Sequence, residues 1–161
     1  AGRVIVIDGI DERLELARAF GADETVDMRE YRTPEERVMR VLELTGFRGA
    51  EVVAEFVGHP QAVPEGIGML AGGGRYLEIG NISPGRTMEM DPSQLVMGSE
   101  SIHGVVCYSP QALKKALDFL SRCKEKYPFD KLLSRTYPLE EVERAFQDQD
   151  KGLVSRAAIV P

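Results

Sequence analysis

The stretch Val4-Ile5-Val6-Ile7-Asp8-Gly9 decides the fold, because four consecutive β-branched residues end at an acidic residue and a glycine. A continuous apolar run of this length is typical of a strand that is buried on both faces, as in a parallel sheet. A helix is predicted next, with Asp11 placed to cap it and Gly21 placed to end it. Its apolar face recurs at helical spacing, at Leu14, Ala17 and Phe20.

Strands and helices continue to alternate along the rest of the chain. Strands are predicted at residues 24–27, 51–55, 75–80, 88–90, 101–106, 132–138 and 156–160. Helices are predicted at residues 34–45, 61–70, 92–97, 110–126 and 139–150. This alternation predicts an α/β fold with a mostly parallel sheet, flanked by helices and joined by right-handed crossovers.

Composition and charge exclude several classes of partner. The 161 residues suffice for one domain, or for one domain with an appendage, and 20 basic residues against 26 acidic ones leave a net charge of -6. Without a basic run there is no electrostatic footprint for a nucleic acid or an anionic membrane, and no apolar run approaches the roughly 20 residues of a membrane helix. Cys107 and Cys123 stand in unlike contexts, so we expect reduced thiols and a cytoplasmic location.

Asp8 is the most informative residue of the chain. Open α/β sheets bind ligands beyond the carboxyl ends of their strands, where this carboxylate can accept hydrogen bonds from both ribose hydroxyls of an adenosine. A 2'-phosphate would be repelled there, so the site would favour NAD over NADP. The alternative interpretation is an aspartate that caps the helix or is simply solvated.

Arg13 follows five residues after Asp8 and lies one turn into the predicted helix. From that position its guanidinium could reach back over the adenosine. The alternative is a solvated arginine on the polar face of the helix, near Glu12 and Glu15.

Motifs for other chemistries are rejected. Residues 66–71 match the glycine pattern of a phosphate loop, but no predicted strand precedes them and more glycines, instead of a helix, follow. The two cysteines and two histidines form neither a CxxC nor an HExxH motif, so we expect no metal site. No elbow motif of the GxSxG kind is present, and we predict no catalytic centre in these residues.

Several segments together resemble the medium-chain, zinc-type alcohol dehydrogenases, and specifically their C-terminal, NAD-binding portion. The most specific is the joint in which the helix at 12–20 is followed by Gly21-Ala22-Asp23 and, three residues later, by Val26. The resemblance continues through residues 55–58, 73–80 and 138–146, with Gly152 and Arg156 near the end. It therefore covers nearly the whole chain.

The resemblance implies a set of cofactor-binding residues. Asp8 and Arg13 match the positions that bind the adenosine ribose, and Arg156 matches an arginine that contacts the pyrophosphate. The remaining matches lie beside the cofactor or hold the nicotinamide carboxamide through the backbone; they are Phe56, Val57, Ile79, Gly80, Val105, Val106 and Cys107. In the family, the strand around 101–106 also pairs across a dimer, which implies a homo-oligomer.

The resemblance also implies what these residues lack. In the full-length family the zinc ligands, most of the substrate pocket and the first strand with its glycine loop all precede the equivalent of Ala1. That strand is the central one in the usual 3-2-1-4-5-6 order, so the sheet would carry two exposed inner edges that invite pairing. Residues 1–108 are then expected to form a partial dinucleotide-binding Rossmann domain, and 109–161 a C-terminal segment that packs back toward the catalytic domain of the full-length family.

The leading functional expectation is a C-terminal fragment of an NAD-dependent, zinc-type alcohol or polyol dehydrogenase, inactive by itself. Such enzymes transfer a hydride between a carbinol carbon and the nicotinamide. Two alternatives stay open at this point. One is a self-associating or partner-completing nucleotide-binding module without catalysis. The other is a domain similar to S-adenosylmethionine methyltransferases, in which an acidic residue at a strand end also binds ribose.

Overall fold

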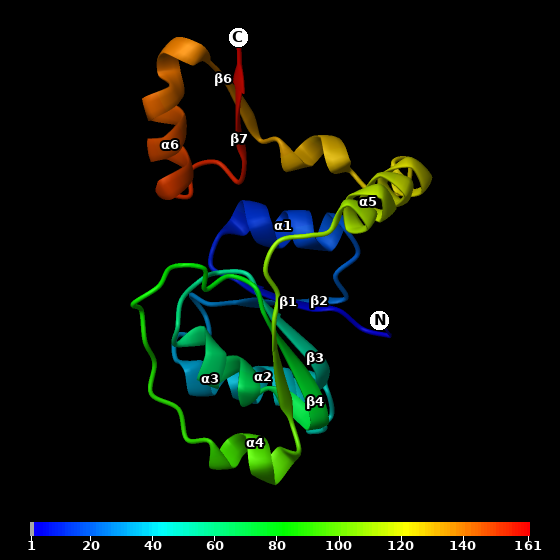
Figure 1. Cartoon of the computed structure of the whole chain (residues 1–161), viewed down its shortest axis with the longest axis vertical. Coiled ribbons are helices and arrows are strands. Elements are labelled where there is room, and N and C mark those ends of the chain that lie inside the picture. The colour runs from blue at the N-terminus through cyan, green and yellow to red at the C-terminus, as the bar shows by residue number, and fades with distance from the viewer. Residues whose placement is uncertain (1) are drawn as a thin grey trace. The chain divides into compact units, whose positions relative to one another are not determined.

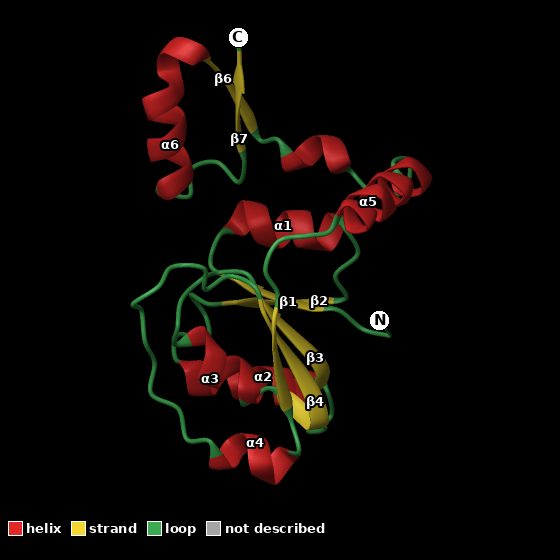
Figure 2. Ribbon diagram, viewed as in Figure 1, coloured by secondary structure: helices red, strands yellow, loops and turns green. Residues whose placement is uncertain are grey.

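The computed structural model describes residues 2–161, which divide into two compact units (Figure 1). Unit 1 comprises the residues up to Glu30 together with Ser109–Pro161, and unit 2 comprises Tyr31–Tyr108. Figure 2 shows helices and strands alternating through both, which is the α/β class predicted from the sequence. The expected division into a partial Rossmann domain at 1–108 and a C-terminal segment at 109–161 stays a prediction.

Unit 1 opens with the predicted strand, helix and strand. These are β1 (Ile5–Asp8), α1 (Asp11–Ala19) and β2 (Glu24–Asp27), and the two strands pair in parallel with Asp8 opposite Asp27. Leu14 and Val26 are buried and anchor the helix on the strand pair. Gly21 ends the helix as predicted, because its φ of 93° is a left-handed conformation that glycine adopts without strain.

The expectation that Asp11 caps α1 is wrong. The N-cap residue is Ile10, and no side chain makes a capping hydrogen bond. The Asp11 carboxylate instead binds the guanidinium of Arg29, which it reaches because the chain returns to the same strand ends after β2.

The C-terminal part of unit 1 is built from the long helix predicted after Ser109 and a second parallel strand pair. Its elements are α5 (Pro110–Cys123), β6 (Arg135–Pro138), α6 (Val142–Asp150) and β7 (Ala157–Val160). Tyr137 on β6 is buried, and its hydroxyl donates to Asp148 Oδ2 on α6 at 2.8 Å. This bond ties the helix to the strand pair.

Unit 2 is a three-stranded parallel sheet in the order β3-β4-β5 with three helices. Its elements are α2 (Pro34–Leu44), β3 (Ala50–Glu55), α3 (Ala62–Ile67), β4 (Leu70–Glu78), α4 (Ser93–Gly98) and β5 (Ser101–Gly104). The core is a cluster of Val63, Ile67, Leu70 and Tyr76. Helix α2 begins with a capping box between Thr33 and Glu36, followed by Pro34 at the first helical position, as its sequence predicts.

The strands of the described residues form three parallel sheets, in the orders β1-β2, β3-β4-β5 and β6-β7. None of the helices in residues 2–161 combines the length and apolar character that crossing a membrane requires.

Three segments differ from their prediction. Residues 88–90 form no strand, and 129–132 form a 3-10 turn that delays β6 until Arg135. β4 begins at Leu70, before the glycine run, instead of at residue 75. Residues 66–69 end helix α3 and lead into this strand, which is the reverse of the strand-to-helix order of a phosphate loop. The rejection of that motif is therefore confirmed.

A candidate adenosine site and a candidate nicotinamide edge

Asp8 lies at the end of β1 in a fixed orientation. Its Oδ1 accepts hydrogen bonds from the backbone N–H groups of Gly9 at 2.7 Å and Ile10 at 3.0 Å. Its Oδ2 lies 3.7 Å from Nη1 of Arg13, and a quarter of the side chain is exposed. The carboxylate is thus held by the backbone on one side and reachable on the other, which suits it to accept hydrogen bonds from a pair of hydroxyls.

Arg13 and Arg156, far apart in sequence, line one open pocket of about 420 Å³. The other lining residues are Phe146, Gln149, Asp150 and Ser155. Two guanidiniums that face one cavity are a donor set for anionic oxygens such as those of a phosphate. The structure thus brings together two of the three residues predicted to bind the adenosine diphosphate half of a dinucleotide.

This pocket exists because the loop after α6 packs against the first turn of α1. Ser155 Oγ donates to Glu12 Oε1 at 3.2 Å, across 143 residues of sequence. At Gly152, whose φ is 69°, an added Cβ would lie only 2.9 Å from Cδ1 of Ile10. The positive φ, which residues with a side chain rarely adopt, explains the glycine at this position.

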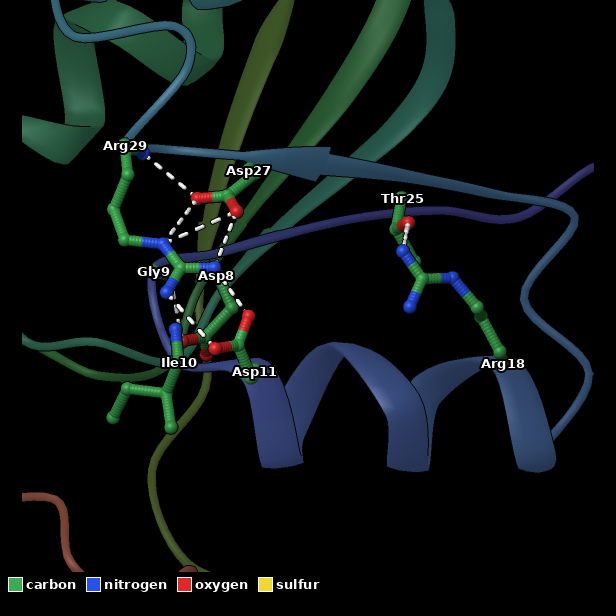
Figure 3. A network of polar contacts seen from close by, with 8 residues as sticks. All are labelled: Asp8, Gly9, Ile10, Asp11, Arg18, Thr25, Asp27 and Arg29. Atoms are coloured by element: carbon green, nitrogen blue, oxygen red, sulfur yellow. Dashed lines mark hydrogen bonds and ion pairs between the residues drawn. The ribbon is translucent and has the colours of Figure 1, made fainter.

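A second polar network, which was not predicted from the sequence, lies at the same strand ends (Figure 3). Arg29 Nε donates to Asp27 Oδ1 at 2.9 Å, Arg29 Nη1 donates to Asp11 Oδ2 at 3.1 Å, and Nη2 contacts both carboxylates. Hydrogen bonds from Arg29 lower the pKa of Asp27 to about 2 and also lower the pKa of Asp11. The available signal was Asp27 itself, which ends the second strand just as Asp8 ends the first.

In unit 2, the residues predicted beside the nicotinamide follow three neighbouring strands. Phe56 and Val57 come directly after β3, Ile79 and Gly80 after β4, and Val105 to Cys107 after β5. Because these strands are parallel neighbours, all three groups lie along one edge of the sheet. Phe56, Val57, Val106 and Cys107 are exposed, so this edge presents apolar side chains to solvent.

Glu55, which ends β3, joins the first two of these groups and was not identified from the sequence. Its buried carboxylate accepts hydrogen bonds from the backbone N–H of Gly58 at 2.6 Å and of Gly80 at 3.1 Å. Two backbone turns are thereby fixed against each other by one side chain. The sequence signal for this role was an acidic residue at the end of an apolar strand, followed three residues later by a glycine.

The donor set fits a dinucleotide better than a metal. Among residues 2–161, no group of three histidine, cysteine or acidic side chains is placed to hold a metal ion. Asp8 with its reachable oxygen, and the pocket of Arg13 and Arg156, instead fit the hydroxyls and phosphates of an adenosine diphosphate. Zinc chemistry therefore has no ligand set within these residues.

Comparison with known proteins gives the same family along most of the chain. A family model described as zinc-binding dehydrogenase matches residues 1–122. The 5-exo-hydroxycamphor dehydrogenase of Pseudomonas putida is 31% identical over 156 residues, which are 97% of this chain and 43% of that protein. The L-threonine 3-dehydrogenase of Bacillus subtilis is 28% identical over an alignment of 163 positions that covers 100% of this chain and 45% of that protein.

Solved structures agree. The alcohol dehydrogenase of Thermotoga maritima superimposes with a TM-score of 0.88 at 29% identity, over 99% of this chain and 43% of that one. The benzyl alcohol dehydrogenase of Acinetobacter calcoaceticus gives a TM-score of 0.84 at 28% identity, over 99% and 42% respectively. The chain thus spans less than half the length of the proteins that it matches. With its parallel strands and its acidic residue at the end of β1, the chain belongs to the zinc-binding dehydrogenase family.

Proposed function

We propose that this chain binds NAD and forms the nucleotide-binding part of an alcohol or polyol dehydrogenase. The observation that carries the proposal is the geometry of Asp8, whose Oδ1 is held by two backbone N–H groups while Oδ2 faces Arg13 at the end of β1. A carboxylate there accepts hydrogen bonds from the 2'- and 3'-hydroxyls of the adenosine ribose and repels a 2'-phosphate. NAD is therefore the proposed cofactor, in preference to NADP.

Several residues have a proposed task around the dinucleotide. Asp8 and Arg13 hold the adenosine ribose, and Arg156 faces the pyrophosphate. Glu55 keeps the turns after β3 and β4 in place through the N–H groups of Gly58 and Gly80. The backbone after β4 and β5, at 79–80 and 105–107, orients the nicotinamide carboxamide.

The chemistry of the whole protein is also a proposal. When bound, NAD supplies the hydride acceptor, and the residues of this chain position it and exclude water from its polar groups. The relatives are named for substrates as different as a hydroxycamphor and L-threonine, so the proposed substrate class is a secondary alcohol or polyol. We expect no turnover from these residues alone, because none of the described ones forms a metal site. The cytoplasmic location stays a prediction.

A cofactor titration tests the proposal. We expect the chain to bind NADH, observed as enhanced nicotinamide fluorescence, which no tryptophan in this sequence complicates. NADPH is expected to bind at least about tenfold more weakly, because its 2'-phosphate meets the Asp8 carboxylate. S-adenosylmethionine should not displace NADH. Absence of NADH binding, or efficient displacement by S-adenosylmethionine, would contradict the proposed function.

Self-association is a second proposed property, and the position of β5 favours it. β5 lies at one end of the described sheet, with one side unpaired in these residues, and exposed Val105 and Val106 follow it. An edge strand with apolar neighbours is a template for pairing with a second copy. We expect light scattering to give about twice the 17.8 kDa of one chain. A monomer at micromolar concentration would contradict pairing through residues 101–106.

A further inference from the structure

Arg29 lies beside the proposed ribose site but does not belong to it. Asp8 and Asp27 are paired at the last positions of β1 and β2, and Arg29 follows Asp27 by two residues. Figure 3 shows the side chains of Asp8, Asp11, Asp27 and Arg29 gathered at these strand ends. A guanidinium therefore lies close to the carboxylate that is proposed to bind the 2'-hydroxyl.

A guanidinium at this place in a dinucleotide fold has a known chemical consequence. Arginine binds phosphate oxygens with a pair of parallel hydrogen bonds, and an arginine near the ribose is what accommodates the 2'-phosphate of NADP. Here the donors of Arg29 are already engaged, since Nε donates to Asp27 and Nη1 donates to Asp11. Both carboxylates compete directly with a phosphate for the same N–H groups.

We propose that Asp11 and Asp27 are specificity-determining residues that hold the Arg29 guanidinium and so keep it from binding a 2'-phosphate. This inference rests on the proposed binding of the adenosine ribose at Asp8. Selectivity for NAD then has two sources in this chain, namely repulsion by Asp8 and the engagement of Arg29 by Asp11 and Asp27.

Burial and ionisation explain why Arg29 stays bound to the two carboxylates at neutral pH and how substitutions can release it. The Asp27 side chain is 18% exposed, against 52% for Arg29 and 75% for Asp11, so Asp27 is the firmer anchor and Asp11 the more strongly solvated one. Hydrogen bonds from Arg29 lower the pKa of both carboxyls, and burial only partly opposes this, so both are ionised at neutral pH. Removing both charges should free the guanidinium without removing a core contact.

The experiment is a set of cofactor titrations on three variants. In Asp11→Asn/Asp27→Asn, the ratio of NADPH affinity to NADH affinity is expected to rise at least about tenfold. This is the change in affinity that the gain of one charge-assisted hydrogen bond produces. Adding Arg29→Met to that variant should remove the gain, which distinguishes Arg29 from the neighbouring Arg13. The matched control is Asp118→Asn/Asp130→Asn, which removes the same charge from exposed positions of α5 and the following turn and should leave the ratio unchanged.

Each outcome decides a separate point. If the unmodified chain binds no NADH, the proposed function fails and this inference fails with it. If the chain binds NADH but the ratio stays constant, rises equally in the control or survives Arg29→Met, only this inference is overturned. Should the double variant not fold, the single variant Asp11→Asn decides, because the exposed side chain of Asp11 supports no core contact. A smaller rise in the ratio of NADPH affinity to NADH affinity is then expected. No rise in that ratio would overturn the inference.

Discussion

Replacing Arg37 with methionine is expected to lower the free energy of unfolding by about 3–5 kcal/mol, the largest effect of a single substitution that we predict. Arg37 on α2 and Glu65 on α3 form a pair of hydrogen bonds, with Nε to Oε1 at 2.6 Å and Nη2 to Oε2 at 2.7 Å. Their side chains are only 8% and 13% exposed. Methionine leaves the Glu65 carboxylate buried without its partner, and that desolvated charge is the source of the loss.

The same guanidinium also donates hydrogen bonds to the backbone just before α2. Its Nη1 donates to the backbone carbonyls of Tyr31 at 3.0 Å and Arg32 at 3.1 Å, which would lose that donor in the variant. Urea unfolding followed by circular dichroism measures the effect. The matched control is Arg40→Met on the same helix, because the Arg40–Glu43 pair is 33% and 49% exposed and should contribute less than about 1 kcal/mol. Equal effects at Arg37 and Arg40 would contradict the argument from burial.

A double variant separates the buried charge from the lost packing. Replacing Arg37 and Glu65 together by methionines leaves no unpaired charge, and buried ion pairs replaced by apolar residues are often neutral in stability. We expect most of the loss to be recovered in this variant. A double variant as unstable as Arg37→Met alone would show that packing, and not the orphaned carboxylate, is responsible.

Replacing Asp8 with asparagine is expected to weaken NADH binding about 100-fold. A hydrogen bond to a charged group contributes about 1.5–3 kcal/mol, and the two ribose hydroxyls proposed to donate to Asp8 would lose that charge together. Asparagine keeps an oxygen for the N–H groups of Gly9 and Ile10, so the turn after β1 should retain its shape. The fluorescence titration with NADH measures the change in affinity.

The control for Asp8 is the same substitution at the opposite end of the same strand pair. Asp23 precedes β2, and its Oδ2 accepts a hydrogen bond from the N–H of Val4 at 2.7 Å, so it also holds backbone at a strand end. Asp23→Asn should leave the NADH affinity within about twofold, since ligands of this fold bind beyond the carboxyl ends of the strands. Equal losses in the two variants would show that Asp8 acts only through the backbone.

Local features of the sequence were sufficient for much of the fold. The β-branched run at 4–7, the helical spacing of Leu14 and Ala17, and Gly21 at the helix end all depend on residues within a few positions of one another. The prediction of a strand at 88–90 was wrong, because three residues of alternating pattern carry too little local information to distinguish a strand from a loop. The placement of Asp8 at the end of β1 followed from the same short stretch.

What only the tertiary structure decided are the contacts between segments that are distant in sequence. The packing of Ser155 against Glu12 forms the pocket shared by Arg13 and Arg156, and the pairing of Asp8 with Asp27 brings Arg29 close to the proposed ribose site. Glu55 binds the N–H of Gly80 across 25 residues. The physical reason is that an apolar run or a helical period is a property of neighbouring residues, whereas strand register and the partner of a carboxylate depend on how separate elements pack. The first stretch of the chain therefore determined its fold class and the position of Asp8, and the folded chain determined which side chains surround Asp8.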